Sequence, residues 1–232
     1  MNATPLARLL LVVAYSWMAH VATLHQDGTL AAIALADLAL LVLLEPLLQR
    51  RSWAAWLLAL ALGGVLVASA DSRYILLPLL LVPPAFVALV AWTFGRTLRA
   101  GRTPLITRIV TAVENVPPAE ISAELHRYTR GLTATWAWVL GFLAVADLAL
   151  ALCAVPGGLL HGLGVAPPVA ISPEAWSWFA NALTWGLVGG LFVGEYYYRV
   201  RRFPGRYTSF FDFLHRMAGL GPAFWRGVLR EG

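Results

Sequence analysis

Two aspartates lie within runs of apolar residues, where an ionised carboxylate is costly. Asp37 occurs in ALADLALL and Asp147 in the closely similar AVADLALAL. A charged side chain within a bilayer costs at least ~2.5 kcal/mol, so it usually faces other helices and finds a partner there. If the two carboxyl groups approach closely, they titrate as a coupled pair and one stays protonated near neutral pH. Such a pair suits either a hydrogen-bonded structural clasp or a proton-linked site.

Two further polar residues, His20 and Asn181, are expected at a similar depth in neighbouring apolar runs. At 1.5 Å per helical residue, Asp37 lies ~12 Å from the outer end of its run, and the other three residues fall in the same outer half of the bilayer. We therefore predict a candidate intramembrane polar pocket of His20, Asp37, Asp147 and Asn181. The alternative is that each group is satisfied separately, or that the carboxyl groups are simply protonated.

The sequence carries no recognisable catalytic motif. It has no G-x-S-x-G, no H-E-x-x-H and no Gly-rich phosphate loop, and its five histidines fall on both predicted sides of the membrane. The single Cys153 excludes a disulfide within the chain, and no metal-ligand spacing is present. We predict no metal and no cofactor, and the sequence argues against a self-contained hydrolase or transferase without excluding one.

The composition is that of an integral membrane protein. Of 232 residues, 59% are hydrophobic and 12% are charged, and the mean hydropathy is +0.71, whereas soluble domains are about 25% charged. Apolar runs of ~20 residues match a hydrocarbon core ~30 Å thick, in which isolated segments must be helical. The predicted fold is an all-α, polytopic membrane helix bundle with six transmembrane helices. The six spans are predicted at about 6–24, 29–48, 53–70, 74–94, 132–154 and 175–198.

The distribution of arginines sets the predicted orientation. All 17 basic residues are arginines, and with this set of spans Arg73 alone falls on one side of the membrane. The others lie near the N-terminus, at 50–51, in the loop 95–131 and after residue 198. Positively charged loops stay in the cytoplasm, so we place the protein in the bacterial inner membrane with both termini cytoplasmic. The sequence pI of about 9.9 therefore reflects topology and does not indicate nucleic-acid binding.

Two short helices are predicted in the cytoplasmic loop. Thr103 is expected as the N-cap of the first, with Pro104 at its first helical position and with Leu105, Ile109 and Val113 on one face. The second, AEISAELHRYTR, is expected to run straight into the span 132–154.

The chain is predicted to divide into a transmembrane domain, 1–206, and a cytoplasmic amphipathic tail, 207–232. The tail segment YTSFFDFLHRM places Phe210, Phe213, Leu214 and Met217 on one face, as in a helix that lies on the inner leaflet.

Four segments resemble an uncharacterised family of bacterial inner-membrane proteins. They are YILLPLLLVPPAFVALVAWTFGRTL, GRTPLITR, HRYTRGLTATWAW and WFANALTWGLVGGLFVGEYYYRVR, within about 74–202. That family is typically encoded in aryl-polyene (xanthomonadin-type) pigment and fatty-acid-like biosynthesis clusters. The resemblance implies roles for Arg108, Arg127, Tyr128, Thr129, Arg130, Trp136, Asn181 and Glu195. Glu195 is also spaced to pair with Arg199 at i,i+4. The predicted cytoplasmic interface comprises Arg108, Arg127, Tyr128, Arg130, Glu195 and Arg199.

The resemblance and the arginine-rich inner face favour an accessory membrane protein that recruits or organises cytosolic enzymes dependent on acyl carrier protein. The expected partners are membrane lipids, acyl carrier protein and enzymes of polyene or fatty-acid synthesis. The basic face also follows from topology alone, so alternatives stay open. One is a small lipid or polyene transporter that uses the outer-half carboxylates. A third is a membrane enzyme acting on an acyl intermediate.

Overall fold

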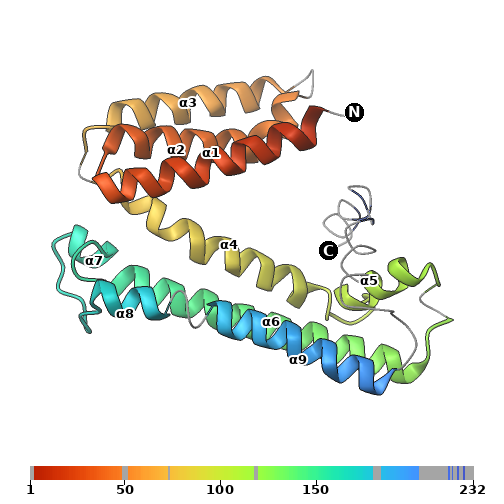
Figure 1. Cartoon of the computed structure of the whole chain (residues 1–232). Helices are drawn as coiled ribbons and strands as arrows, with labels where there is room; N and C mark the ends of the chain where they lie inside the picture. Colours follow the sequence, from red (N-terminus) through yellow and green to blue (C-terminus); the bar gives the residue numbers. More distant parts are fainter. Residues whose placement is uncertain are drawn as a thin grey trace. The chain divides into compact units, whose positions relative to one another are not determined.

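The computed structural model describes residues 3–48, 52–72, 74–117, 120–179 and 184–203, with single positions at 219, 221, 224 and 227. Over these residues the chain is all-α, with nine helices, as Figure 1 shows. Their bounds are α1 Ala3–His25, α2 Gly28–Leu48, α3 Trp53–Ser69, α4 Leu77–Arg96, α5 Leu105–Glu114, α6 Ala123–Cys153, α7 Leu159–Gly162, α8 Pro173–Trp178 and α9 Thr184–Arg202. The helices fall into two compact units, which we describe separately.

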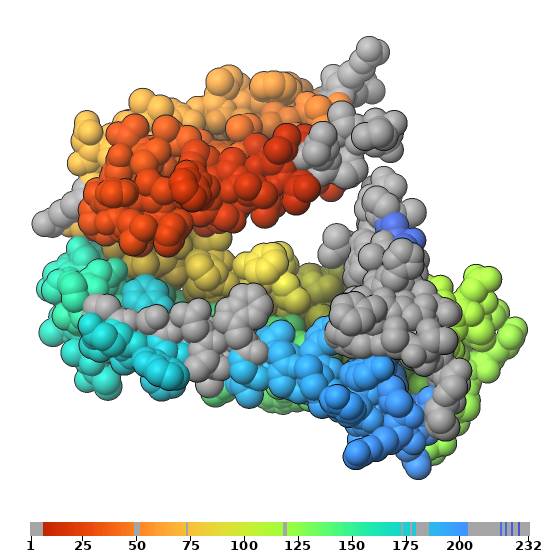
Figure 2. All heavy atoms as spheres, in the orientation of Figure 1, coloured from red at the N-terminus to blue at the C-terminus, as the bar shows by residue number. Residues whose placement is uncertain are grey.

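Unit 1 comprises residues 1–82 and 151–170 and is built around α1, α2 and α3. In Figure 2 the red-to-orange atoms of these helices pack against one another. The buried core consists mainly of alanines, together with two larger residues: Ala22, Ala31, Ala32, Ala34, Ile75 and Leu79. Small side chains let helix backbones approach closely, which is how helices gain packing energy in a membrane.

The α1–α2 turn is short and tightly hydrogen-bonded. Gln26 has a φ of 53°, and the side chain of Asp27 accepts a hydrogen bond of 3.0 Å from the backbone N–H of Leu30. The next residue, Gly28, lies so close to the backbone oxygen of Ala70 that a Cβ there would overlap it. The end of α3 therefore packs directly on the start of α2.

Unit 2 comprises residues 83–150 and 171–232, and α6 is its longest helix. The 31 residues of α6 span ~46 Å at 1.5 Å per residue, more than a ~30 Å hydrocarbon core requires. This confirms the prediction that the loop helix continues into the following apolar run.

The helices α6 and α9 lie side by side and antiparallel (Figure 1). Near the start of α6, Glu124 forms an ion pair with Arg202 at the end of α9. Farther along, Trp136 of α6 meets Phe192 of α9 with ring centroids 5.7 Å apart. The contacts therefore advance along α6 while they move backwards along α9.

Within the described part of the chain, four helices are long and apolar enough to cross a membrane: α1 over Ala7–His25, α2, α4 and α6. Large apolar side chains on these helices and on α3 are exposed, including Trp17, Val67 and Trp138, each at 70% or more. Soluble proteins rarely expose so much contiguous apolar surface. These features are those of a multi-pass membrane protein.

The remaining predicted spans have a less direct counterpart. The helix α3 is apolar but has 17 residues. The predicted span 175–198 corresponds to α8 and α9, and residues 180–183 between them lie outside the described part of the chain. The predicted tail helix, 207–217, also lies outside it, as does Asn181. Six spans and the division at residue 206 therefore stay predictions.

Candidate functional site

The short helix α5 is fixed to its neighbours by threonine hydroxyl groups. The hydroxyl oxygen of Thr97, after the end of α4, accepts a hydrogen bond of 3.0 Å from the backbone N–H of Leu105. The hydroxyl oxygen of Thr133 on α6 accepts one of 3.2 Å from the N–H of Ile106. The first N–H groups of a helix have no partner within the helix, so these two hydroxyls cap α5 from other elements.

The expectation that Thr103 caps α5 is therefore wrong. Pro104 directly precedes the helix, and no side-chain cap comes from that position. The predicted face is confirmed, because Leu105 and Ile109 are buried and Val113 packs against them. Local periodicity sets the face of this helix, but the capping groups come from tertiary neighbours.

A buried threonine pair strengthens the contact between α5 and α6. The hydroxyl oxygens of Thr107 and Thr129 lie 2.7 Å apart, and both residues are 1% exposed or less. The Thr129 hydroxyl also donates to the backbone oxygen of Leu125, at 3.0 Å. Because buried polar groups are costly without partners, this network holds α5 in one position against α6.

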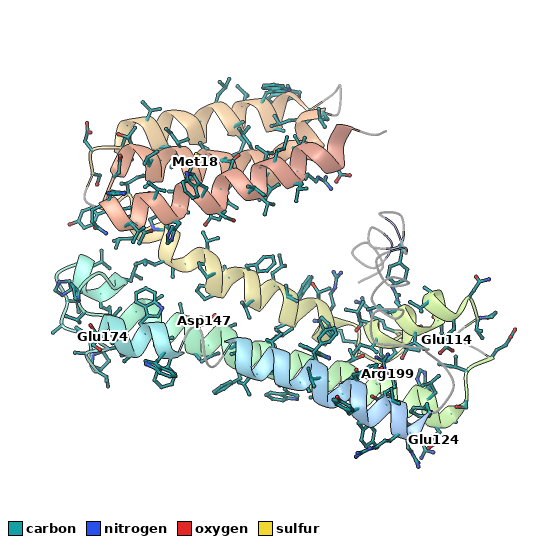
Figure 3. All side chains as sticks on the ribbon, viewed as in Figure 1. Met18, Glu114, Glu124, Asp147, Glu174 and Arg199 are labelled. Atoms are coloured by element: carbon teal, nitrogen blue, oxygen red, sulfur yellow. The ribbon has the colours of Figure 1, made fainter. Side chains whose placement is uncertain are left out.

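Beside α5, three polar side chains from α6 and α9 form a buried cluster. The Tyr128 hydroxyl donates a hydrogen bond of 2.8 Å to Oε1 of Glu195, and Nε of Arg199 lies 3.2 Å from the same oxygen. The side chains of Arg199 and Glu195 are 8% and 10% exposed. The expected i,i+4 pair is confirmed, and Tyr128 shares its carboxylate. Figure 3 shows Arg199 near α5, with Asp147 farther along α6.

An apolar cavity of about 350 Å³ borders this cluster. Eleven apolar residues from four helices, with Glu195 and Arg199, line it within the described part of unit 2. The apolar residues are Val90 and Phe94 on α4, Leu105, Ile106, Ile109 and Val110 on α5, Leu132, Trp136 and Leu140 on α6, and Val188 and Phe192 on α9. Volumes of ~300–1,000 Å³ with few polar groups are typical of small-molecule sites.

Three aromatic rings from three helices form part of the cavity wall. The ring of Trp136 lies 6.2 Å from that of Phe94 and 5.7 Å from that of Phe192, measured between centroids. A second set of rings lies next to the ion pair, where Tyr128 stacks on Tyr198 at 5.7 Å and contacts Phe203 at 5.3 Å between centroids. The aromatic contacts therefore add to the ion pair in holding α6 against the C-terminal part of α9.

The arginines at this end of unit 2 have different environments. Arg96 is buried and its guanidinium lies 4.5 Å from the ring centroid of Trp92. The side chain of Arg130 donates a hydrogen bond of 2.8 Å to the backbone oxygen of Leu98. Arg108 lies on α5 and is partly buried, whereas Arg127 on α6 is exposed. The predicted cytoplasmic interface is therefore part buried cluster and part exposed basic surface.

The residues of the predicted intramembrane pocket belong to different units. Asp37 is buried in unit 1 at 8% exposure, and among the described residues its Oδ2 has no hydrogen-bond partner. His20, also in unit 1, is exposed, and Asp147 is partly buried in unit 2. The joint pocket stays a prediction. The structure brings together Tyr128, Glu195 and Arg199 instead.

Sequence reasoning missed the cavity and most of the threonine network. Phe94 and Phe192 read as ordinary membrane-helix residues, because aromatic residues are common there. Four threonines were a clearer signal of this contact in the sequence. Thr97 directly follows α4, Thr107 lies on α5, and Thr129 and Thr133 lie on α6. Buried hydroxyls at such positions indicate helix–helix hydrogen bonds.

No protein-family model, curated protein or solved structure matches this chain.

Proposed function

We propose that this chain is an accessory protein of the bacterial inner membrane that recruits cytosolic enzymes dependent on acyl carrier protein. In this proposal the chain has six spans, both termini face the cytoplasm, and the system makes aryl polyenes or related lipids. The observation that carries the proposal is a set of exposed arginines where α4 ends, α6 begins and α9 ends. They are Arg99, Arg127, Arg130, Arg201 and Arg202.

The partner that suits this surface is an acidic protein. Of the five arginines, Arg202 is paired with the carboxylate of Glu124, and Arg130 bonds a neutral backbone carbonyl and so keeps its charge. A patch of one sign speeds the encounter with a partner of the opposite sign, and salt weakens this effect. Acyl carrier proteins are acidic, and the buried threonine network holds the underlying helices in place. The arginines therefore stand on helices with fixed positions, which suits a transient electrostatic contact.

The test is binding of purified acyl carrier protein to the full chain in lipid nanodiscs. The double variant Arg127→Gln/Arg201→Gln removes two exposed charges from unit 2. Arg8→Gln is a single-charge control outside unit 2, because Arg8 is an exposed residue of unit 1 that pairs with Glu45. We expect the double variant to bind acyl carrier protein about tenfold more weakly than the wild type. The control should bind as the wild type does. Added salt should weaken binding to the wild type and to both variants. Absence of binding at low salt, or equal losses in both variants, would reject the proposal.

A lipid or polyene transporter is the second candidate, and Asp37 favours it. This buried carboxyl group has an oxygen without a hydrogen-bond partner among the described residues, and intramembrane acids often mark ion or substrate paths. The substitution Asp37→Asn keeps hydrogen-bonding capacity and removes titration. Loss of product export, with normal accumulation of the variant protein, would support transport. Unchanged export would reject a proton-linked role for Asp37.

A further inference from the structure

The cavity in unit 2 combines an apolar interior with one polar end. Its described walls come from α4, α5, α6 and α9, and the only charged residues among them are Glu195 and Arg199. A smaller cavity beside it shares Ile106, Val110, Leu132 and the same two charged residues, and it also borders Tyr128. The polar cluster therefore stands where the two cavities meet.

The shape of the walls limits what can occupy this space. A volume of about 350 Å³ lies at the small end of the ~300–1,000 Å³ range of ligand pockets. A space of this size suits a single hydrocarbon chain. The rings of Phe94 and Phe192 and the aliphatic side chains of α5 have no hydrogen-bonding groups, and Trp136 has only the N–H donor of its indole ring.

The polar end supplies the selectivity that an apolar wall lacks. Lipid tails are as apolar as leucine, so a chain gains little by leaving the bilayer for an apolar cavity. Hydrogen bonds at a buried polar group are stronger than in water because the local dielectric is low. The Arg199 guanidinium carries donors and the Glu195 carboxylate carries acceptors. The Tyr128 hydroxyl donates its hydrogen to Glu195 and can still accept a hydrogen bond. A ligand that is retained there needs a polar group at the end of its chain.

We infer that this cavity binds the hydrocarbon chain of a single-chain fatty acyl ligand, with its polar head at the Tyr128–Glu195–Arg199 cluster. The inference stands on the cavity and its lining alone, so failure to recruit a carrier protein would leave it intact. The threonine-capped helix α5 supplies one wall of the cavity. Loss of binding to this cavity would in turn leave the basic surface unaffected.

The test uses the full chain in lipid nanodiscs and palmitic acid with a photoreactive diazirine at the end of its chain. After irradiation, the modified peptides are mapped by mass spectrometry. We expect saturable labelling at the end of the cavity away from the polar cluster, around Leu140 on α6 and Val188 on α9. Unlabelled palmitic acid should compete, whereas hexadecane, which has no polar group, should not. Probe that only dissolves in the nanodisc lipid labels the protein in proportion to its concentration. Such non-specific labelling therefore does not saturate.

Matched variants on α9 locate the binding. Val188 lines the cavity, and Val193 on the same helix is 53% exposed and does not line it. We expect Val188→Trp to fill the space and lower labelling about tenfold or more, with Val193→Trp unchanged. If Val188→Trp fails to fold, Val90→Trp and Leu89→Trp form a second pair on α4, because Val90 lines the cavity and Leu89 is 57% exposed.

The polar end has its own variant. Tyr128→Phe keeps the ring contacts and removes the hydroxyl, and it should weaken competition by palmitic acid a few-fold, by ~3–10 times. Equal labelling of Val188→Trp and the wild type would overturn the inference, as would competition by hexadecane equal to that by palmitic acid. Absence of labelling in the wild type would do so too. Phe224 packs against Leu105 and Ile109, and its side chain would then be the occupant of this space.

Discussion

Glu195 and Arg199 form an ion pair one turn apart on α9, with Nε and Oε1 separated by 3.2 Å and both side chains about nine-tenths buried. Removing one partner leaves the other charge buried without compensation. We expect Arg199→Met to lower the free energy of unfolding by about 3–5 kcal/mol. Thermal unfolding of the protein in nanodiscs measures this loss.

The control for this prediction is the exposed ion pair between Arg202 and Glu124, whose side chains are 58% and 52% exposed. Exposed pairs contribute about 0–1 kcal/mol, so Arg202→Met should unfold near the wild-type temperature. A double variant, Glu195→Gln/Arg199→Met, should recover part of the loss because no uncompensated charge remains. Equal losses for Arg199→Met and Arg202→Met would contradict the prediction.

The Thr133 hydroxyl accepts a hydrogen bond at the start of α5. It should therefore contribute more to the stability of α5 than the hydroxyl of Thr135 does. Thr133→Val removes the acceptor for the Ile106 N–H, and the loss of such a cap costs about 1 kcal/mol. Thr135→Val is the control, since the Thr135 hydroxyl is exposed and bonds only within α6, to Gly131, among the contacts that the structure describes. Hydrogen exchange of the α5 amides should rise in Thr133→Val and stay unchanged in Thr135→Val.

Gly28 allows the close approach of α2 to the end of α3. A Cβ at this position would overlap the backbone oxygen of Ala70, which moves only with the chain itself. We expect Gly28→Ala to lower the unfolding temperature of unit 1. Gly63→Ala should leave it unchanged or raise it, because nothing lies within 4 Å of that added Cβ and alanine favours helices. An equal loss of unfolding temperature in both variants would contradict this, because the close contact with Ala70 exists only at Gly28.

The proposed topology makes a separate prediction from the arginine distribution. Reporter fusions after Ser72 and Val165 should report the periplasm, and fusions after Arg51, Asn115 and Gly232 the cytoplasm. Alkaline phosphatase, which is active only outside the cytoplasm, and a fluorescent protein that matures only inside it provide the paired readout. A periplasmic C-terminus would contradict an even number of spans.

Much of the local structure follows from the sequence. The length and apolarity of α1, α2, α4 and α6 follow from composition, since a buried backbone in lipid must be helical. The buried face of α5 follows from the spacing of Leu105, Ile109 and Val113. The Glu195–Arg199 pair follows from the i,i+4 geometry of a helix. Each of these depends on residues within a few turns of one another.

The tertiary structure decided the parts that depend on distant residues. The hydroxyl that caps Ile106 belongs to Thr133, 27 positions away, and no local pattern distinguishes it from Thr135. The aromatic rings that line the cavity come from α4, α6 and α9, and a cavity exists where side chains from four helices fail to fill the space between them. Periodicity encodes which face of a helix is apolar, but which neighbour that face meets is set by packing of the whole unit.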